Sequence, residues 1–218
     1  MKDIAPLKNI LRLGVLSSSI LISGCSTYQV GSEIQAGTQD LLIGKSESAV
    51  AYFQAAAAQD PSYARDIGYM REGVWTYLGR ANYDAGKLPE ARQALQRAVG
   101  QDDHDYLAKL YLGLALARAE NRDLGRKSIQ SGLQGLHDWL EYTKRNSFYG
   151  QFWDPSRVIS SEIDADLAMI SNRDIDWPKV IASGEWVGKK MEEEIDLARR
   201  DESHEYDRDG AGRRMMRH

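Results

Sequence analysis

The residues that could support catalysis or metal binding are few and scattered. None of the four histidines (His104, His137, His204 and His218) pairs with another histidine or with a cysteine at a metal-binding spacing. A Gly-x-Ser-x-Gly motif, which would place a nucleophilic serine on a sharp turn, is absent from the sequence. We therefore expect no catalytic residue, no metal site and no enzymatic activity.

Three groups of acidic residues are closer together, and each has a simpler explanation. The acids at 102–105 fall in a turn between two predicted helices. The segment 207–210 resembles part of a calcium loop but lacks the glutamate that would bind the ion with both oxygens. Glu162, Asp164 and Asp166 lie on a predicted helix, where their side chains diverge. We expect all three groups to be solvated.

The only cysteine of the chain, Cys25, follows a basic start and a short apolar stretch at 13–22. This order is typical of a secretory signal peptide. The apolar stretch is too short to span a bilayer, which takes about twenty residues. The motif Ile22-Ser23-Gly24-Cys25 resembles the lipobox of bacterial lipoproteins. The alternatives are an ordinary signal peptide and a buried N-terminal helix.

The lipoprotein resemblance implies a location and a covalent lipid. In that family the signal peptide, here 1–24, is cleaved, and Cys25 receives diacylglycerol on sulfur and an N-acyl chain such as palmitate. Two or more chains anchor a protein stably to a membrane. The segment 25–45 would be the acylated N-terminus and a linker. Ser26, in place of aspartate, resembles the outer-membrane class, so we expect the inner leaflet of the outer membrane, facing the periplasm.

Charge excludes one class of partner and predicts a tail. The chain carries a net charge of −4 and has no basic stripe, so we expect no nucleic-acid partner. Acids outnumber arginines between 192 and 209, and the last residues show no apolar period. This composition predicts a disordered charged tail at 202–218.

From 46 to 144 the sequence has a helical period and repeats itself, while strand signals are nearly absent. The segment 75–98 resembles a tetratricopeptide repeat. A second copy follows 34 residues later, with Leu112-Gly113 and Ile129 in register. A partial earlier copy is offset by 42 residues and holds Ala49, Phe53 and Ala56. The residues of the best copy that match the family are Trp75, Leu78, Gly79, Gly86, Ala91, Leu95 and Ala98.

The resemblance implies an all-α fold with about two and a half tetratricopeptide-like hairpins in 46–144. Repeats bury their faces against neighbours, so the last repeat needs a cap. The segment 145–201 is expected to supply this cap from an aromatic loop, a helix starting at Asp154-Pro155 and two later helices separated at Ser183-Gly184. The alternative is that the loop forms an exposed anchor for a partner, made of Phe148, Tyr149, Phe152 and Trp153.

In the repeat family, the first helix of each hairpin lines a groove that binds a peptide or helix of another protein. The corresponding polar positions here are Arg80, Tyr83, Asp84 and Arg118. In the second copy the groove positions are mostly apolar, which predicts that a segment such as the C-terminal third covers them. These positions are Leu107, Leu110, Leu114 and Ala117.

The two resemblances together imply a non-catalytic adaptor or scaffold for an envelope assembly. The candidate assemblies are secretion or pilus pores, outer-membrane biogenesis and peptidoglycan machinery, and the sequence does not choose among these partners. One alternative is a small-ligand-binding or enzymatic lipoprotein that uses the aromatic C-terminal third. Another is a structural envelope protein that self-associates.

Overall fold

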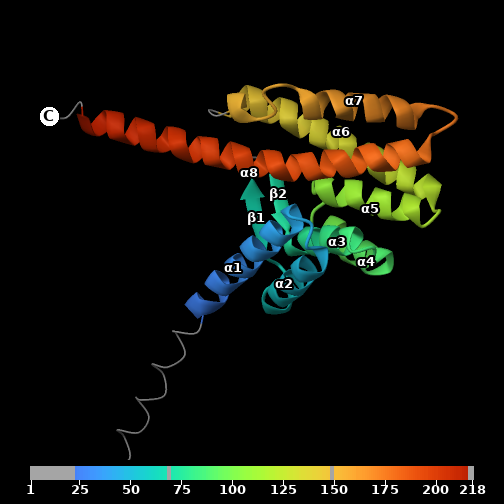
Figure 1. Ribbon diagram of the computed structural model, residues 1–218, viewed down its shortest axis with the longest axis horizontal. Helices are drawn as coiled ribbons and strands as arrows, with labels where there is room; N and C mark the ends of the chain where they lie inside the picture. Colours follow the sequence, from blue (N-terminus) through green and yellow to red (C-terminus); the bar gives the residue numbers. More distant parts are fainter. Residues whose placement is uncertain (1–22, 68–69, 148–149, 216–218) are drawn as a thin grey trace, which may run out of the picture.

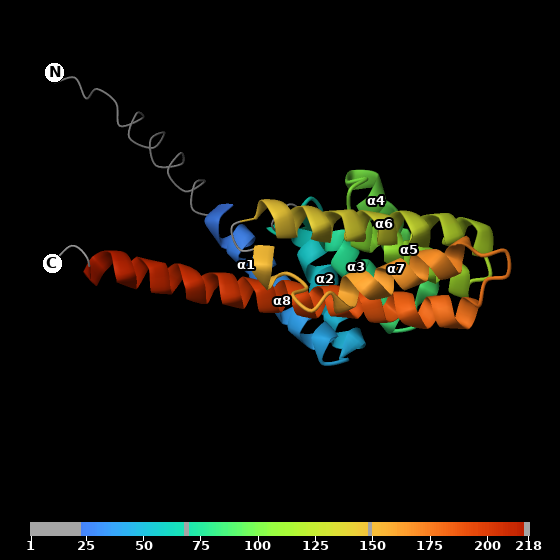
Figure 2. The same cartoon turned by 90° about the horizontal axis from the view of Figure 1, so that it is seen from above.

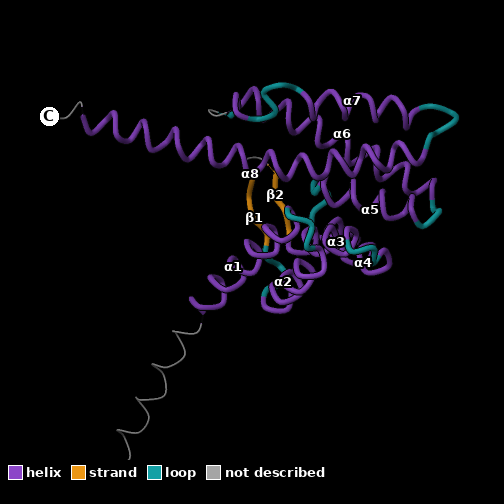
Figure 3. Tube along the Cα trace, in the orientation of Figure 1, coloured by secondary structure: helices purple, strands orange, loops and turns teal. Residues whose placement is uncertain are grey.

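The structure is a computed structural model that describes the backbone of residues 23–67, 70–147 and 150–215, and side chains within 29–66, 70–147 and 150–197. The described part is largely helical, with one short β-hairpin (Figures 1 and 3). Its elements are α1 (Ser23–Leu42), α2 (Ser46–Gln59), β1 (Ala64–Ile67), β2 (Met70–Gly73), α3 (Val74–Asp84), α4 (Leu88–Gln101), α5 (Tyr106–Arg118), α6 (Arg122–Asn146), the 3-10 helix η1 (Gly150–Phe152), α7 (Val158–Ser171) and α8 (Trp177–Met215).

Consecutive helices pack in pairs. Helix α1 lies against α2, α3 against α4, and α5 against the first part of the longer α6. Helices α7 and α8 then return along the same body, with α7 on α6 and α8 on both α7 and α5 (Figure 2). One apolar core joins α1 to α4, and a larger one extends from α3 to α8.

The first three helix pairs share one interhelical contact. In α3, a methyl group on Gly79 would collide with the side chain of Leu95 in α4. In α5, a methyl group on Gly113 would lie 2.5 Å from the backbone nitrogen of Ile129 in α6. The α1–α2 pair has the same arrangement, because a methyl group on Gly37 would lie 2.6 Å from the ring of Phe53. In each pair, sixteen residues separate the glycine from its apolar partner, so the helices approach closely at equivalent positions.

The three pairs also share one turn. Gly44, Gly86 and Glu120 follow the first helix of each pair, with φ angles of 77°, 75° and 61°. This left-handed conformation suits glycine and strains residues that have a β-carbon. In each turn the next backbone N–H donates to a carbonyl five residues earlier: Lys45 to Asp40 (2.8 Å), Lys87 to Asn82 (2.8 Å) and Asn121 to Leu116 (2.9 Å).

The β-hairpin explains why the spacing between copies is irregular. Equivalent positions are 42 residues apart in the first and second pairs but 34 apart in the second and third. Strands β1 and β2 pair antiparallel within the connection from α2 to α3, where the additional residues fall. The expectation of an all-α chain therefore missed this hairpin, whose strands are only four residues long.

The C-terminal third differs from the sequence prediction in its boundaries. Helix α7 begins at Val158 rather than at Asp154-Pro155. The Asp154 carboxylate still caps it, accepting hydrogen bonds from the backbone N–H groups of Ile159 (3.0 Å) and Ser160 (3.1 Å). The chain reaches this position through a loop in which Asp154 and Arg157 have positive φ angles.

Helix α8 is one continuous element, so the predicted break at Ser183-Gly184 is wrong. A methyl group on Gly184 would lie 2.9 Å from Leu114, and one on Gly188 would lie 2.6 Å from the ring of Tyr111. These glycines therefore serve close packing of α8 on α5. The backbone remains helical to Met215, although the sequence predicts a disordered tail at 202–218, and Figure 1 shows this end of α8 extending beyond the other helices. Helix α1 likewise occupies most of the predicted linker at 25–45.

Candidate functional site

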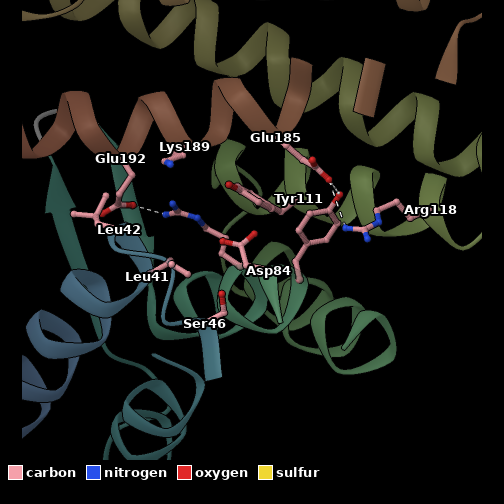
Figure 4. Close-up of a pocket in the computed structure, with 12 residues that line it drawn as sticks. Leu41, Leu42, Ser46, Asp84, Tyr111, Arg118, Glu185, Lys189 and Glu192 are labelled. Atoms are coloured by element: carbon pink, nitrogen blue, oxygen red, sulfur yellow. Dashed lines mark hydrogen bonds and ion pairs between the residues drawn. The ribbon is translucent and has the colours of Figure 1, made fainter. Parts of the chain in front are cut away.

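A cavity of about 380 Å³ lies where α8 crosses the first helices of the pairs (Figure 4). Helices α3, α5 and α8 form its walls, together with the end of α1 and the turn into α2. Its lining residues are Leu41, Leu42, Gly44, Ser46, Arg80, Tyr83, Asp84, Tyr111, Arg118, Glu185, Lys189 and Glu192.

Arg80 occupies the inner wall of the cavity and joins three elements. Its Nη1 is 2.8 Å from Glu72 Oε1 in β2 and 2.5 Å from Glu192 Oε2 in α8. The guanidinium also lies over the ring of Tyr111 in α5, 5.2 Å from its centroid. Arg80, Glu72 and Glu192 are all at most 2% exposed, so these charges are held away from water.

Glu72 and Glu192 share the buried guanidinium of Arg80, and the half-buried guanidinium of Arg65 also attracts both carboxylates. Burial is the main reason why the pKa of Glu72 rises to about 7, and the nearby charge of Glu192 raises it further, while Arg80 opposes both effects. Near neutral pH, Glu72 is therefore partly protonated. Burial also raises the pKa of Tyr111 to about 12, so its hydroxyl stays neutral.

A second polar group closes the other end of the cavity. The Tyr83 hydroxyl donates a hydrogen bond of 2.5 Å to Glu185 Oε1. Arg118 Nη1 lies 3.5 Å from the same oxygen, and its guanidinium is 5.0 Å from the centroid of the Tyr83 ring. Burial and the bond to Glu185 raise the pKa of Tyr83 well above its usual value, so it acts as a neutral donor.

Two charged side chains at the rim remain without an ion-pair partner among the described residues. Asp84 ends α3, and Lys189 projects from α8 on the facing wall (Figure 4). Both residues are exposed. They are not within ion-pair distance of one another. Burial raises the pKa of the Asp84 carboxyl, while the charges of Arg80, Lys189 and Arg118 favour its ionised form.

The structure brings together all four residues that the repeat register predicts for a groove, because Arg80, Tyr83, Asp84 and Arg118 line this one cavity. They are not equally available to a partner. Arg80 and Tyr83 are only 2% and 1% exposed, since α8 covers them. The prediction that they contact a partner directly therefore needs correction: in this arrangement, of the four, only Asp84 and Arg118 face solvent.

The apolar groove positions are covered by the C-terminal third, as the sequence predicts. Leu107, Leu110 and Leu114 are fully buried, and α8 packs directly on α5 through Gly184 and Gly188. The groove is thus filled by a helix of the same chain.

The aromatic loop contributes one residue, Trp153, to the core. Trp153 is 2% exposed, and its ring meets that of Trp139 edge to face at 5.0 Å. It caps the core, so the alternative of an exposed anchor is wrong for Trp153. Phe152 is half-buried in η1, and Phe148 and Tyr149 lie outside the described residues.

Two of the acids that were expected to be solvated, Asp105 and Asp166, are buried, and the side chains of 207–210 lie outside the described residues. Asp105 caps α5 by accepting a 2.9 Å hydrogen bond from the backbone N–H of Ala108, and Thr76 donates to its other oxygen. Burial raises the pKa of Asp105 to about 6. Asp166 is fully buried rather than solvated, and burial raises its pKa to about 6 as well. In the part of the chain that is described, no three His, Cys, Asp or Glu side chains are grouped so that they could hold a metal ion.

Sequence reasoning missed the contribution of α8 to the cavity. Glu185, Lys189 and Glu192 were not assigned to a site, and only the excess of acids from 192 onward was noted. The available signal was their spacing, because residues four and seven positions apart share one helical face. Gly184 and Gly188, four apart, mark an adjacent strip that packs on another helix.

Comparison of the chain with protein-family models, with curated proteins and with solved structures gives no match. Within the described residues, no helix is both long enough and apolar enough to cross a bilayer. The predicted signal peptide at 1–24 falls almost entirely outside those residues. The backbone of Cys25 belongs to α1, but its side chain is not described.

Proposed function

We propose that this protein is a lipid-anchored, non-catalytic adaptor of the bacterial cell envelope, built on three tetratricopeptide-like hairpins. The observation that carries the proposal is the contact repeated in α1–α2, α3–α4 and α5–α6. Each pair has a glycine opposite an apolar residue sixteen positions later, followed by the same left-handed turn. Arrays of such pairs offer extended surfaces for other proteins.

The α1–α2 pair strengthens the repeat interpretation. The sequence indicated only its second helix, yet Gly37 and Gly44 occupy the positions of Gly79 and Gly86. The signature Trp and Leu of the family are missing from α1, where Glu33 and Ala36 occupy their positions, which is why this helix was not recognised.

The proposal of a lipid anchor is based on the segment that ends at Cys25. The basic start, the short apolar stretch and the Ile22-Ser23-Gly24-Cys25 motif support a lipoprotein that faces the periplasm. Cys25 lies in the first turn of α1, which continues to Leu42, so the repeat body would lie close to the membrane surface.

The surface for an envelope partner is proposed at the cavity rim, because the rest of the groove is filled by α8. Asp84 and Arg118 are the groove residues that remain exposed there. The C-terminal aromatic residues give no support to an enzymatic alternative, since Trp153 is part of the core.

The test places a photo-crosslinking amino acid at Asp84 or at Arg118 in the full chain, expressed in its native cells. The matched control position is Leu124, which is 53% exposed on α6 and lies away from the cavity lining. We expect both rim positions, but not Leu124, to form an adduct with one envelope protein. Adducts that are equally frequent at Leu124, or absent from both rim positions, would refute the adaptor.

Lipidation is measured separately by metabolic labelling with an alkyne fatty acid. The wild-type chain should be labelled and sediment with membranes, whereas Cys25→Ser should be unlabelled and released. Labelling that survives Cys25→Ser would contradict anchoring at this residue.

A further inference from the structure

The cavity is the part of the groove that α8 leaves open. Leu41 and Leu42, at the end of α1, give it an apolar side, and the rings of Tyr83 and Tyr111 line it as well. Its volume of about 380 Å³ lies within the range of small-molecule pockets, about 300–1,000 Å³. A helix of another protein does not fit such a space, but a small molecule does.

The charges around the cavity indicate what kind of molecule it would accept. Three cationic and three anionic side chains line it, so the lining as a whole favours neither a simple anion nor a simple cation. Four of the six are already paired, as Arg80 with Glu192 and Arg118 with Glu185. The two that remain, Asp84 and Lys189, have opposite signs.

These two residues lie on facing walls, Asp84 on α3 and Lys189 on α8 (Figure 4). Since they form no ion pair with each other, each can form a charge-assisted hydrogen bond with a ligand. A molecule that carries both an ammonium and a carboxylate complements both walls at once. A molecule with only one of these charges leaves one wall unpaired.

We propose that the cavity binds a small zwitterion of the amino-acid type, with its carboxylate at Lys189 and its ammonium at Asp84. The side chain of the ligand would lie against Leu41 and Leu42. This proposal goes beyond the adaptor function and does not depend on it, since the ligand contacts only this chain.

The test is isothermal titration calorimetry on the purified full-length chain. The probes are L-alanine, L-leucine and L-glutamine, with leucinamide and N-acetyl-leucine as analogues that each lack one of the two charges. We expect saturable binding of at least one amino acid. If L-leucine binds, the loss of one charge-assisted contact should weaken each analogue by about tenfold or more.

Variants at the rim give an independent readout. Asp84→Asn and Lys189→Gln remove one charge each from exposed positions, so the fold should be retained, which circular dichroism checks. Each should weaken amino-acid binding by about tenfold or more. Lys179→Gln, an exposed lysine on the same helix but outside the cavity, should bind as the wild type does.

Three results would overturn the proposal: no saturable heat with any of the amino acids, equal binding of the single-charge analogues, or unchanged binding by both rim variants. None of these results bears on the adaptor, which is tested by crosslinking in cells. Conversely, a missing envelope partner leaves the calorimetric result intact.

Discussion

At the scale of single residues, Glu120 departs from the pattern that the other turns follow. Its φ angle is 61°, and the equivalent residues of the first two turns are Gly44 and Gly86. Its side chain is exposed and forms no hydrogen bond or ion pair with the described residues. This conformation costs about 1–2 kcal/mol for a residue with a β-carbon, whereas glycine loses more entropy on folding.

We therefore expect Glu120→Gly to stabilise the protein by about 0.5–1 kcal/mol, since relief of strain outweighs the added entropy cost. The measurement is the urea midpoint followed by circular dichroism. Gly86→Ala is the reverse change at the equivalent turn and should destabilise by a similar amount or more. A lower midpoint for Glu120→Gly would mean that the turn tolerates this residue without strain.

The sequence predicts such residues well where small residues recur at a fixed distance. Gly79, Leu95 and their counterparts Gly113 and Ile129 were found from the 34-residue register, and the structure brings each glycine against its apolar partner. Gly37 was missed although the offset of 42 was recognised, because Glu33 and Ala36 stand where the best copy has Trp75 and Leu78. The hairpin at 64–73, which accounts for that offset, was missed as well. Its strands are too short to produce a recognisable alternation of apolar and polar residues.

At the scale of elements, the buried group of Glu72, Arg80 and Glu192 joins β2 and α3 to α8. The sequence could not predict this group, because Arg80 and Glu192 are 112 residues apart and only the path of α8 brings them together. The same holds for Asp84 and Lys189 at the rim. Long-range pairs of this kind depend on tertiary packing, whereas caps such as Asp105 depend on local sequence.

This group makes the attachment of α8 depend on pH. The pKa of Glu72 is raised to about 7 in the folded chain from an ordinary value of 4.5, so the folded state holds a proton that the unfolded state releases. The stabilisation that comes from the proton on Glu72 is therefore complete at low pH and is lost as the pH rises from 4.5 through about 7. Asp105 and Asp166 also lose a stabilising proton as the pH rises. Their pKa values of about 6 put most of this loss at a lower pH than that of Glu72.

We expect the free energy of unfolding to fall by roughly 1 kcal/mol between pH 6 and 7, mainly through Glu72. Glu72→Gln mimics the protonated form and should flatten the profile in that interval. Asp105→Asn keeps the helix cap, because asparagine and aspartate cap equally well, and should change the profile mainly below about pH 6. Urea unfolding at half-unit pH steps measures both, and a fall between pH 6 and 7 that is as steep in Glu72→Gln as in the wild type would exclude this residue as its main source.

At the scale of the whole molecule, the groove can open only if α8 detaches from the other helices. Val180, Val187, Met191 and Ile195 are at most 1% exposed, and they anchor α8 in the larger core. At about 1.5–3 kcal/mol each, their burial contributes roughly 6–12 kcal/mol. That is comparable with the entire stability of a typical domain, about 5–15 kcal/mol. A partner helix that displaced α8 would have to replace all of this energy, so we regard α8 as a fixed part of the fold.

Two truncations test this argument. A chain that ends at Asp176 lacks α8, and we expect it to show no cooperative thermal unfolding, because the core would lose the four apolar side chains and Glu72 and Arg80 would lose Glu192. A chain that ends at Leu197 keeps all of these contacts and loses only the end that extends beyond the other helices, so its midpoint should stay within a few degrees of the full chain (Figure 1). If the shorter chain instead unfolded cooperatively near the midpoint of the full chain, α8 would be a detachable occupant, and the whole groove, with Arg80 and Tyr83, would become available to an envelope partner.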